Sequence, residues 1–597
     1  MTGEADFRGV VEAWIADDPD ARDRAELQAL LDRAFADGGS AAGGGGGSAG
    51  GAGATGPLDE LRDRFAGRLE FGTAGLRGVV AAGPNRMNRA VVRAATAAVA
   101  GWLLGSGTDG ERRPGDGGAR DAVRVAVGCD ARHRSAEFSD EAARVLAGAG
   151  IAVGLLPLPC PTPLLAFAVR NLAASAGVMI TASHNPAADN GYKLYLSDGA
   201  QVIPPVDAEI EARMAGLGPL SRIPVADADS PLITRHGDEI ARAYLDAVVP
   251  AAAGAAREWA ELTVVYTPMH GVAGDLMLRA IGRAGFAAPH VVAEQAQPDP
   301  DFPTVAFPNP EEPGALDLAL ADARRLGADL VLASDPDGDR LAVAARRPGD
   351  GPDGWVVLTG DQVGALLGAS LLDRTTDDVA PGGRLVASTI VSSTLLSKIA
   401  AAAGARYEET LTGFKWIVRA ADHVPGARFA FGYEEALGYA VGDVVRDKDG
   451  IGAALAVLAL AAGAKEAGRS VLEVYDGLES AHGVHLTSQV TLRTADQARV
   501  MSRLRADPPD RLGRQPVTGL ADLARVGDGG LPRADVLIFR LTDARVVLRP
   551  SGTEPKIKCY IEITEPVAGR TLTAAREAAA RRLIPLRHAL EALLANT

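Results

Sequence analysis

Short apolar runs alternate with longer helical segments along most of this chain, and this rhythm restricts the fold more than any other feature of the sequence. Such runs have the length and composition of buried strands. They lie at residues 123–127, 151–155, 178–180, 262–266, 330–333 and 428–431, and the rhythm starts afresh near 262 and again near 356. Strands that alternate with helices predict βαβ units, in which helices cover both faces of a sheet.

The last part of the chain has a different pattern. Strands at 486–492 and 536–539, a turn at 549–552 and a long final helix predict an α+β domain. A chain of 597 residues is too long for one core, so about three to five domains are expected. We predict an α/β protein with three similar domains built on mixed sheets, followed by the α+β domain. The predicted ranges are 1–56 for N-terminal helices and an insertion, 57–232, 233–350 and 351–478 for domains I to III, and 479–597 for domain IV.

Two segments are dominated by small residues. Residues 37–56 consist almost wholly of Gly, Ala and Ser, and residues 105–118 are similarly rich in Gly. Such tracts bury little surface and lose much backbone entropy on folding, so we expect flexible surface insertions. The residues before the first tract, up to Ala36, are expected to form two short amphipathic helices.

The composition excludes several classes of protein. The net charge of −15 argues against a nucleic-acid or anionic-membrane partner, because both bind basic surfaces. Three cysteines, at 129, 160 and 559, cannot form a disulfide framework and lack the spacing of a zinc site. Residues 1–20 show no export signal, and the apolar run 450–464 is too short for a bilayer and predicts a buried helix. We expect a soluble cytoplasmic protein.

A serine directly after an apolar run is the first candidate functional residue. Ser183 and His184 lie in the sequence Thr-Ala-Ser-His-Asn-Pro, which follows the run 177–180, and residues 187–193 are expected to form a turn. A hydroxyl at the end of a strand can be held rigidly and remain exposed, as a nucleophile or phosphate carrier requires. The alternative is a serine that only forms hydrogen bonds within a polar turn.

Three alternating carboxylates follow another apolar run. Asp335, Asp337 and Asp339 are separated by Pro and Gly, which can bend the chain so that the carboxylates converge. Each pair of like charges about 4 Å apart costs roughly 4 kcal/mol at an effective dielectric constant of 20. Ligands that are all oxygen atoms predict a hard divalent cation, and Mg²⁺ is the first candidate. An EF-hand is excluded, because Gly338 lies at the wrong position of the loop. The alternative is a solvated acidic turn.

Two further polar stretches follow strands. Adjacent Glu434 and Glu435, flanked by glycines, suit the recognition of vicinal sugar hydroxyls, although two surface acids would look the same. Residues 446–450 are most simply a solvated turn that caps the next helix. The stretch 549–558 combines an Arg, two hydroxyls and a glycine, which offer donors to a phosphate, and a tight turn is the alternative. The stretch 71–78, with three glycines and an Arg, also suits an anion.

Taken in order, these stretches resemble the α-D-phosphohexomutase superfamily from about Leu58 to the end of the chain. The variants at 71–78, 410–416 and 433–439 are most similar to the branch that holds bacterial phosphoglucomutases and the eukaryotic phosphoglucomutase-2 and phosphopentomutase group. The resemblance implies four domains around a central cleft. It departs at Ala436, where many relatives have a Ser that completes the reader of sugar hydroxyls. This departure puts the identity of the sugar in doubt.

The resemblance also implies a role for each matching residue. Ser183 would be phosphorylated in the resting enzyme, and a phosphoserine oxygen would complete the Mg²⁺ site of the three aspartates. Catalytic roles fall on Ser183, His184, Lys193 as general acid/base, Arg77 and Arg340. Substrate-binding roles fall on Thr412, Gly413, Glu434, Glu435 and Lys448, and on Arg549, Ser551, Gly552 and Thr553, which would grip the phosphate that does not react.

The predicted activity is the interconversion of hexose 1-phosphate and hexose 6-phosphate, with glucose before mannose. It would proceed through a phosphoserine enzyme and a hexose 1,6-bisphosphate, with glucose 1,6-bisphosphate or an equivalent as primer. Phosphopentomutase or hexose 1,6-bisphosphate synthase on the same site remain alternatives. A phosphatase that uses the aspartates would not need a second phosphate grip, and a sugar-phosphate sensor would not need every chemical group. We expect a monomer or weak dimer with no nucleic acid or membrane partner.

Overall fold

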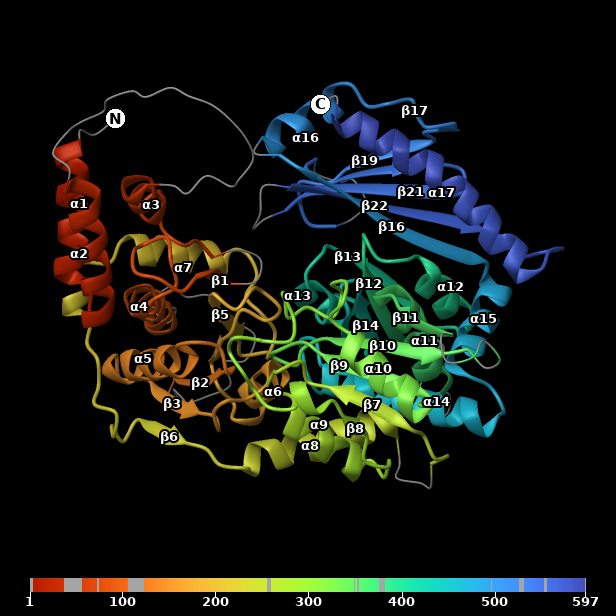
Figure 1. Ribbon diagram of the computed structural model, residues 1–597, viewed down its shortest axis with the longest axis horizontal. Coiled ribbons are helices and arrows are strands. Elements are labelled where there is room, and N and C mark those ends of the chain that lie inside the picture. Colours follow the sequence, from red (N-terminus) through yellow and green to blue (C-terminus); the bar gives the residue numbers. More distant parts are fainter. Residues whose placement is uncertain are drawn as a thin grey trace. The chain divides into compact units, whose positions relative to one another are not determined.

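The computed structural model describes most of the chain as two compact units (Figure 1). One unit comprises Met1–Ile240 and Pro298–Pro308, and the other Ala241–Gln297 and Asn309–Thr597. The described residues are 4–36, 56–71, 75–105, 123–254, 259–347, 349, 351, 354–374, 382–494, 496–525, 531–551 and 556–595. Residues 37–55 and 106–118, where the flexible insertions were predicted, lie outside the described residues.

The first unit is a six-stranded mixed sheet with helices on both faces. The strand order is β1-β5-β4-β2-β3-β6, in which β2, β3, β4 and β6 are parallel and β5 is antiparallel to both of its neighbours. The strands are β1 (Leu76–Val79), β2 (Arg124–Cys129), β3 (Ala152–Leu155), β4 (Ala176–Ile180), β5 (Asp189–Leu196) and β6 (Ile233–Arg235). The helices are α1 (Glu4–Asp17), α2 (Ala21–Phe35), α3 (Pro57–Arg64), α4 (Arg89–Gly105), α5 (Ser135–Gly148), α6 (Thr162–Asn171) and α7 (Val206–Ala215).

Successive side chains of each strand point to opposite faces of the sheet, and the buried side chains on both faces explain why helices cover both. Val125 and Val127 on β2 share a buried core with residues of α4, α5 and α7. The intervening face is lined by small residues, and a side chain added at Gly177 would meet Val169 of α6. The three apolar runs predicted in this region are confirmed as β2, β3 and β4, and the two N-terminal helices are confirmed as α1 and α2.

One local prediction in this unit is wrong. The turn predicted at 187–193 is mostly strand, because β5 begins at Asp189 and pairs with both β4 and β1. Pairing with these neighbouring strands overrides the local turn signal of Asn and Gly. In the stretch 71–78, which suits an anion, residues 76–79 form β1, and residues 72–74 lie outside the described residues.

The second unit contains two further mixed sheets, with strand orders β11-β10-β9-β7-β8 and β13-β12-β14-β15. The first is built from β7 (Val264–Thr267), β8 (His290–Val291), β9 (Leu330–Ser334), β10 (Leu341–Arg346) and β11 (Trp355–Leu358). The next is built from β12 (Arg384–Thr389), β13 (Arg406–Thr410), β14 (Arg428–Glu434) and β15 (Gly438–Val441). The rhythm expected to restart near 356 falls on β11, which is hydrogen-bonded to β10 and so extends the first of these sheets.

The helices of this part are α8 (Glu239–Ala253), α9 (Gly274–Arg283), α10 (Asp317–Leu326), α11 (Gly360–Arg374), α12 (Leu395–Ala402), α13 (Phe414–Ile417), α14 (Gly450–Glu466) and α15 (Val471–His482). The predicted buried helix is confirmed as α14, which is buried along nearly its whole length. Within the described residues, no single helix is long and apolar enough to span a membrane. The bent pair α14 and α15 passes that test by length and composition alone.

The C-terminal part is a five-stranded antiparallel sheet with helices on one face. The order is β16-β22-β21-β20-β19, with α17 (Leu572–Ala595) packed along it (Figure 1). The strands are β16 (Val484–Arg493), β19 (Gly519–Asp522), β20 (Leu537–Arg540), β21 (Ala544–Pro550) and β22 (Lys556–Glu565), and a small hairpin is formed by β17 (Arg511–Leu512) and β18 (Gln515–Pro516). Phe539 faces α16 (Gln497–Ala506) and α17, whereas Ile538 faces Ile390 beyond β12. The predicted α+β domain is confirmed.

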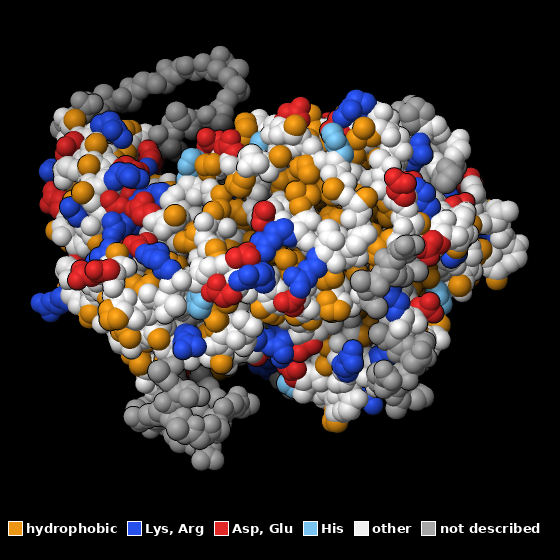
Figure 2. All heavy atoms as spheres, turned by 90° about the horizontal axis from the view of Figure 1, so that it is seen from below, with side chains coloured by type: hydrophobic (Ala, Val, Ile, Leu, Met, Phe, Trp, Pro, Cys, Tyr) orange, Lys and Arg blue, Asp and Glu red, His pale blue; other side chains and the backbone are white. Residues whose placement is uncertain are grey.

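Charged side chains are interspersed on the surface. Lys and Arg lie beside Asp and Glu over the face seen in Figure 2. The net charge of −15 is therefore not gathered there into a field of one sign.

A buried polar cluster joins the C-terminal sheet to the loop after β12. Glu562 on β22 accepts hydrogen bonds from Ser393 Oγ (2.9 Å) and from Thr394 N (2.7 Å), at the start of α12. His485 Nδ1 on β16 lies 2.9 Å from the same carboxylate, and Arg545 Nε on β21 donates to it at 2.9 Å. A carboxylate at a helix N-terminus that also receives an Arg is strongly stabilised in its charged form.

This cluster predicts a loss of stability in acid. Burial by itself raises the pKa of Glu562, but the bonds from His485, Arg545 and Thr394 outweigh burial and lower the pKa from 4.5 to about 2. The stabilisation is complete when the pH lies above 4.5, the pKa of Glu562 in the unfolded chain, and it disappears as the pH falls from 4.5 towards 2. It amounts to roughly 3 kcal/mol. The free energy of unfolding of the wild type, measured by chemical denaturation, should fall by this amount as the pH is lowered through that window. The free energy of unfolding of Glu562→Gln should lack this part of the pH dependence. Parallel curves for the two proteins would contradict the prediction.

Candidate active site

Ser183 lies in the loop between β4 and β5, directly after a fully buried strand. Its backbone is left-handed (φ 53°), which costs a residue with a side chain roughly 1–2 kcal/mol. The residue is 2% exposed, and its N–H donates to Thr181 Oγ1 at 2.9 Å. Ser183 Oγ lies 3.2 Å from His184 Nδ1. The hydroxyl is thus held in a strained turn with an imidazole beside it.

One guanidinium holds this loop in place. Arg132 donates to the carbonyl oxygens of Ser183 (2.7 Å), Asn185 (2.5 Å), Pro186 (2.7 Å) and Asp189 (3.1 Å). Arg132 is itself paired with the buried Asp130 (Nε–Oδ2 3.4 Å), and it stacks over the ring of Phe302 at 5.0 Å. Four bonds from one rigid fork fix the loop backbone and offset the strain at Ser183.

Arg77 and Lys193 lie on the strands beside this loop. Arg77 on β1 is opposite Gly191 on β5, and its Nη1 donates to Asn185 Oδ1 at 3.1 Å. Lys193 lies on β5 opposite Met179, and it is 2% exposed. A side chain added at Gly75 would meet the backbone at residues 192 and 193, so the chain before β1 passes directly along Lys193. The first unit therefore brings the serine, the histidine, the arginine and the lysine to one end of its sheet.

The three aspartates form the connection between the antiparallel strands β9 and β10. All three are completely buried, and one ligand oxygen from each lies within 4.8 Å of the others. Asp335 Oδ1 also accepts the backbone N–H of Arg340 at 3.0 Å, which tightens the turn. Three buried carboxylates this close together fit a hard divalent cation in both chemistry and spacing. The alternative of a solvated acidic turn is excluded by their burial.

A lysine and a capped helix border the aspartates. Lys448 Nζ lies 3.2 Å from Asp339 Oδ2 and 3.2 Å from Asp447 Oδ1. The stretch 446–450 was predicted to be solvated, which is wrong for Asp447, Lys448 and Asp449, all of which are buried. The predicted cap is confirmed, because the Asp449 side chain accepts from Ile451 N and from Gly452 N. Burial is possible here because the charges and donors of this turn satisfy one another.

The sugar-recognition candidates lie where β14 turns back into β15. Glu434 ends β14, and the backbone oxygen of Ala436 accepts Arg340 Nη1 at 2.9 Å. Glu435 Oε2 is 3.3 Å from both Thr389 Oγ1 and Ser392 Oγ. Burial raises the pKa of Glu434 even though Lys448 and Arg340 lower it, and burial raises the pKa of Glu435 as well. Arg340 thus ties the aspartate turn at 335–339 to this sugar-type turn at 434–437.

Thr412 and Gly413 form the short connection between β13 and α13, and Gly413 has a positive φ of 112°. Next to them, the ring of Phe414 lies 5.5 Å from Lys448 Nζ. Lys448 therefore contacts both the aspartate turn and the start of α13.

The phosphate-binding candidates lie at the hairpin of β21 and β22. Arg549 on β21 is directly opposite Lys558 on β22, and Ser551 N donates to Lys556 O at 2.8 Å, which closes the turn. Gly552 and Thr553 lie outside the described residues. Burial lowers the pKa of Lys558, whereas Glu435 raises it. The hairpin places a cationic pair beside the acidic sugar-type turn.

The predicted site residues fall into two groups. Ser183, His184, Arg77 and Lys193 come together in the first unit, and all the other described ones lie in the second. Sequence reasoning missed Arg132, Glu311 and Lys558. The charged spacing Asp-x-Arg after the run 123–127 was a weak signal for the first. Glu311 lies in a Pro-rich stretch with no periodicity, and Lys558 falls at the end of the phosphate stretch, where its own role could not be predicted.

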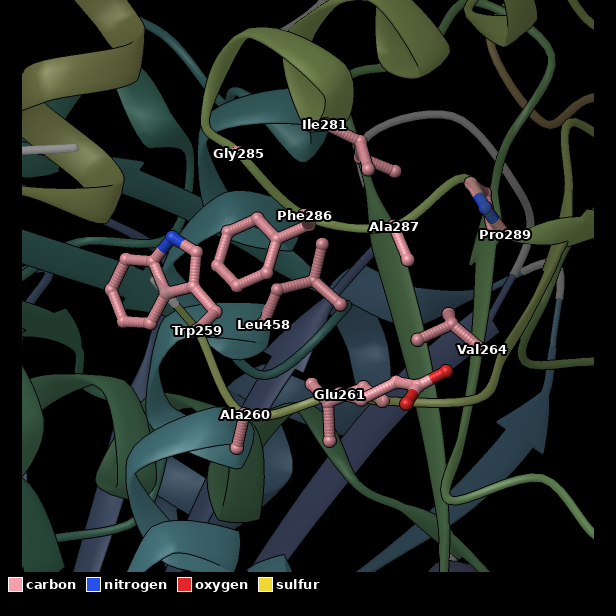
Figure 3. Close-up of a pocket in the computed structure, with 11 residues that line it drawn as sticks. Trp259, Ala260, Glu261, Val264, Ile281, Gly285, Phe286, Ala287, Pro289 and Leu458 are labelled. Carbon is pink, nitrogen blue, oxygen red and sulfur yellow. The ribbon is translucent and has the colours of Figure 1, made fainter. Parts of the chain in front are cut away.

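The second unit also contains a pocket of about 250 Å³ (Figure 3). It is lined mainly by apolar side chains from the segment before β7, the end of α9 and α14, and Trp259 stacks on Phe286 at 4.7 Å. Glu261 is the charged residue of its lining. It contains none of the predicted site residues and offers no cluster of polar groups for a sugar phosphate.

Comparison with known sequences gives matches along most of the chain. Models of domains I, II and III and of the C-terminal domain of phosphoglucomutase/phosphomannomutase match residues 68–218, 242–350, 359–481 and 504–579. A protein of Haemophilus influenzae named "Probable phosphomannomutase" is 38% identical over 80% of this chain and 93% of its own length. The phosphopentomutase of Mus musculus is 33% identical over 86% of both chains. The phosphoglucomutase of Staphylococcus epidermidis is 33% identical over 83% of this chain and 91% of its own.

The fold also has solved counterparts. The structure of a phosphoglucomutase/phosphomannomutase family protein from Burkholderia thailandensis matches 88% of this chain and 97% of its own, with a TM-score of 0.64 and 22% identity. At this identity the likeness concerns the fold, and it agrees with the three α/β domains and the C-terminal α+β domain described above.

The close approach of α14 to the aspartate turn yields a test of the cation site. A methyl group at Gly450 would lie 2.5 Å from Arg340 O and 2.8 Å from Gly338 O, so Gly450→Ala must displace the turn. We expect a loss of about 1–3 kcal/mol of stability and a smaller gain in melting temperature when Mg²⁺ is added. Gly463→Ala on the same helix meets nothing within 4 Å and is the matched control, with unchanged Mg²⁺ response. Equal Mg²⁺ responses of both variants would contradict this placement of the ion.

Proposed function

The chain belongs to the phosphoglucomutase/phosphomannomutase family and is a phosphosugar mutase, and we propose that it interconverts hexose 1-phosphate and hexose 6-phosphate, with glucose before mannose. The observation that carries this proposal is the arrangement of the second unit. There the buried aspartates, the acidic sugar-type turn and the basic hairpin are connected through Arg340, Lys448 and Lys558. A cation site, a hydroxyl reader and a phosphate grip are the parts that a phosphosugar mutase needs.

In this proposal Ser183 carries the phosphoryl group. The free hydroxyl of the sugar attacks phosphorus, so that a P–O bond forms to the sugar and the bond to Ser183 Oγ breaks. The amine of Lys193 takes the proton from that hydroxyl, and Arg77 and His184 hold and neutralise the phosphoserine loop. The grip of Arg132 supports this role, because an in-line transfer requires a donor oxygen in a fixed position.

Asp335, Asp337 and Asp339 would hold Mg²⁺, together with an oxygen carried by Ser183. When bound, the ion neutralises charge on the phosphoryl oxygens. The convergence of the three carboxylates supports this assignment. Arg340 would keep the ligand turn in register with the sugar-type turn, through its bond to the oxygen of Ala436.

The product of the first transfer is a sugar bisphosphate, which must turn round before its other phosphoryl group returns to Ser183. We propose that Glu434, Glu435, Thr412, Gly413 and Lys448 bind the sugar, and that Arg549, Ser551, Gly552 and Thr553 grip whichever phosphate does not react. A bisphosphate such as glucose 1,6-bisphosphate would prime the unphosphorylated enzyme.

A second candidate keeps the site and changes the substrate. Ala436 stands where the family resemblance implies a Ser, and a relative named phosphopentomutase is 33% identical, the same identity as a relative named phosphoglucomutase. Phosphopentomutase or hexose 1,6-bisphosphate synthase activity is therefore the alternative. We also propose a cytoplasmic location, which the three free, buried cysteines fit, and a monomer or weak dimer.

A turnover panel tests the proposed substrate. With Mg²⁺ and a priming bisphosphate, glucose 1-phosphate should exceed mannose 1-phosphate and ribose 1-phosphate in kcat/KM by tenfold or more, which is about 1.4 kcal/mol of transition-state preference. A lead for ribose 1-phosphate would replace the hexose assignment by the phosphopentomutase alternative. No turnover of any sugar would overturn the mutase proposal for these substrates and leave bisphosphate synthesis as the activity to test.

A further inference from the structure

The sugar-type turn at 434–437 offers fewer hydrogen-bond acceptors to sugar hydroxyls than its two glutamates suggest. Glu435 Oε2 lies 3.3 Å from the hydroxyl oxygens of Thr389 and Ser392, which point it towards the loop after β12. Ala436 contributes no polar side chain, and its backbone oxygen already accepts Arg340 Nη1 at 2.9 Å. Glu434 is thus the carboxylate of this turn best placed for a ring hydroxyl.

A further carboxylate reaches the same guanidinium from another part of the unit. Glu311 lies in the turn at 309–312, which is closed by bonds from Glu312 N to Asn309 O (3.0 Å) and from Glu311 N to Asn309 Oδ1 (3.2 Å). Glu311 Oε2 is 3.6 Å from Arg340 Nη1, the nitrogen that also bonds Ala436 O. The same guanidinium nitrogen therefore contacts both Glu311 and the backbone of the sugar-type turn at Ala436.

We propose that Glu311 is a specificity-determining residue that accepts a hydrogen bond from a ring hydroxyl of the sugar phosphate, beside a turn in which Ala436 offers no polar side chain. The inference rests on the proposed phosphosugar mutase function and concerns the sugar end of the same site. The side chain of Glu311 is 40% exposed, so a ligand can reach it. The charges of Glu434 and Lys558 also act on the Glu311 carboxylate, so it lies near both the sugar-type turn and the basic hairpin.

The electrostatics of this position favour a neutral donor. Burial raises the pKa of Glu311, and Arg340 and Lys558 lower it again, while Glu434 raises it further. A second carboxylate beside Glu434 is costly unless donors are shared between them. A sugar hydroxyl supplies such a donor without adding charge, and bonds from hydroxyls to carboxylates are among the stronger ones.

The alternative is that Glu311 only orients Arg340. Arg340 borders Asp339 at 3.9 Å, so a role through Arg340 would alter the cation site and would affect every substrate alike. A direct role affects the sugars unequally and vanishes for a sugar that lacks the hydroxyl in question. These two patterns can be separated by kinetics.

The experiment compares Glu311→Ala and Glu311→Gln with the neighbouring Glu312→Gln as matched control. The substrates are glucose 1-phosphate, its 2-, 3- and 4-deoxy analogues, ribose 1-phosphate and 2-deoxyribose 1-phosphate, each with Mg²⁺ and a priming bisphosphate. For the sugar that the wild type prefers, we expect Glu311→Ala to lower kcat/KM about tenfold or more and Glu311→Gln to lower it less. With one deoxy analogue of that sugar, wild type and variants should agree within about twofold. Glu312→Gln should follow the wild type throughout.

Three results would overturn the inference. An equal loss on every sugar, together with a raised Mg²⁺ requirement, would assign Glu311 to the orientation of Arg340. Unchanged kinetics of both Glu311 variants would remove it from the site. Equal losses for Glu311→Gln and Glu312→Gln would show a general effect of charge. Failure of the proposed function is distinct, because the wild type itself would then turn over none of these sugars.

Discussion

The proposed chemistry depends on the grip of one guanidinium on one loop. Arg132 bonds four backbone oxygens between Ser183 and Asp189 and is held in turn by Asp130 and Phe302. Without such bonds a left-handed serine would relax, because its conformation costs roughly 1–2 kcal/mol. The loop is therefore rigid because of a residue far earlier in the chain, and the sheet of the first unit brings the two together through β2 and β4.

In the second unit, the main constraint is the repulsion among buried negative charges. Three buried aspartates concentrate negative charge in a turn between antiparallel strands. Lys448 offsets part of this charge directly, and Arg340 connects it to the sugar-type turn. Under the proposed function, an acidic protein can handle an anionic substrate because Arg549 and Lys558 lie at the hairpin that we propose grips a phosphate. Glu562 shows the same logic in a structural role, where a carboxylate joins two domains through Arg545, His485 and the start of α12.

The sequence predicted the architecture well wherever the signal was local. Strands such as β4 and β9 are short apolar runs, and α14 is a continuous apolar helix, so their burial could be read from composition. The aspartate turn was also predictable, because three alternating carboxylates after a strand repel one another unless a cation binds them. Its burial, which excludes a solvated turn, is visible only in the structure.

The failures came from contacts between distant residues. Residues 189–193 carry turn-forming Asn and Gly, yet they form β5 because two strands pair with it. The charged turn at 447–449 is buried because Lys448 meets Asp339, a contact no local pattern reveals. Arg132 and Glu311 were missed for the same reason. Each acts on a loop that comes from another part of the chain, and a single charged residue has no periodicity to mark it.

Intact-mass spectrometry of the purified protein tests the central claim most directly. If Ser183 carries the phosphoryl group, the wild type should contain about one phosphate, located on the peptide with Ser183, and Ser183→Ala should contain none and be inactive. Addition of glucose 6-phosphate should remove the phosphate from the wild type, with formation of the bisphosphate. An active wild type whose Ser183 is never phosphorylated, or a Ser183→Ala variant with full mutase activity, would contradict the account.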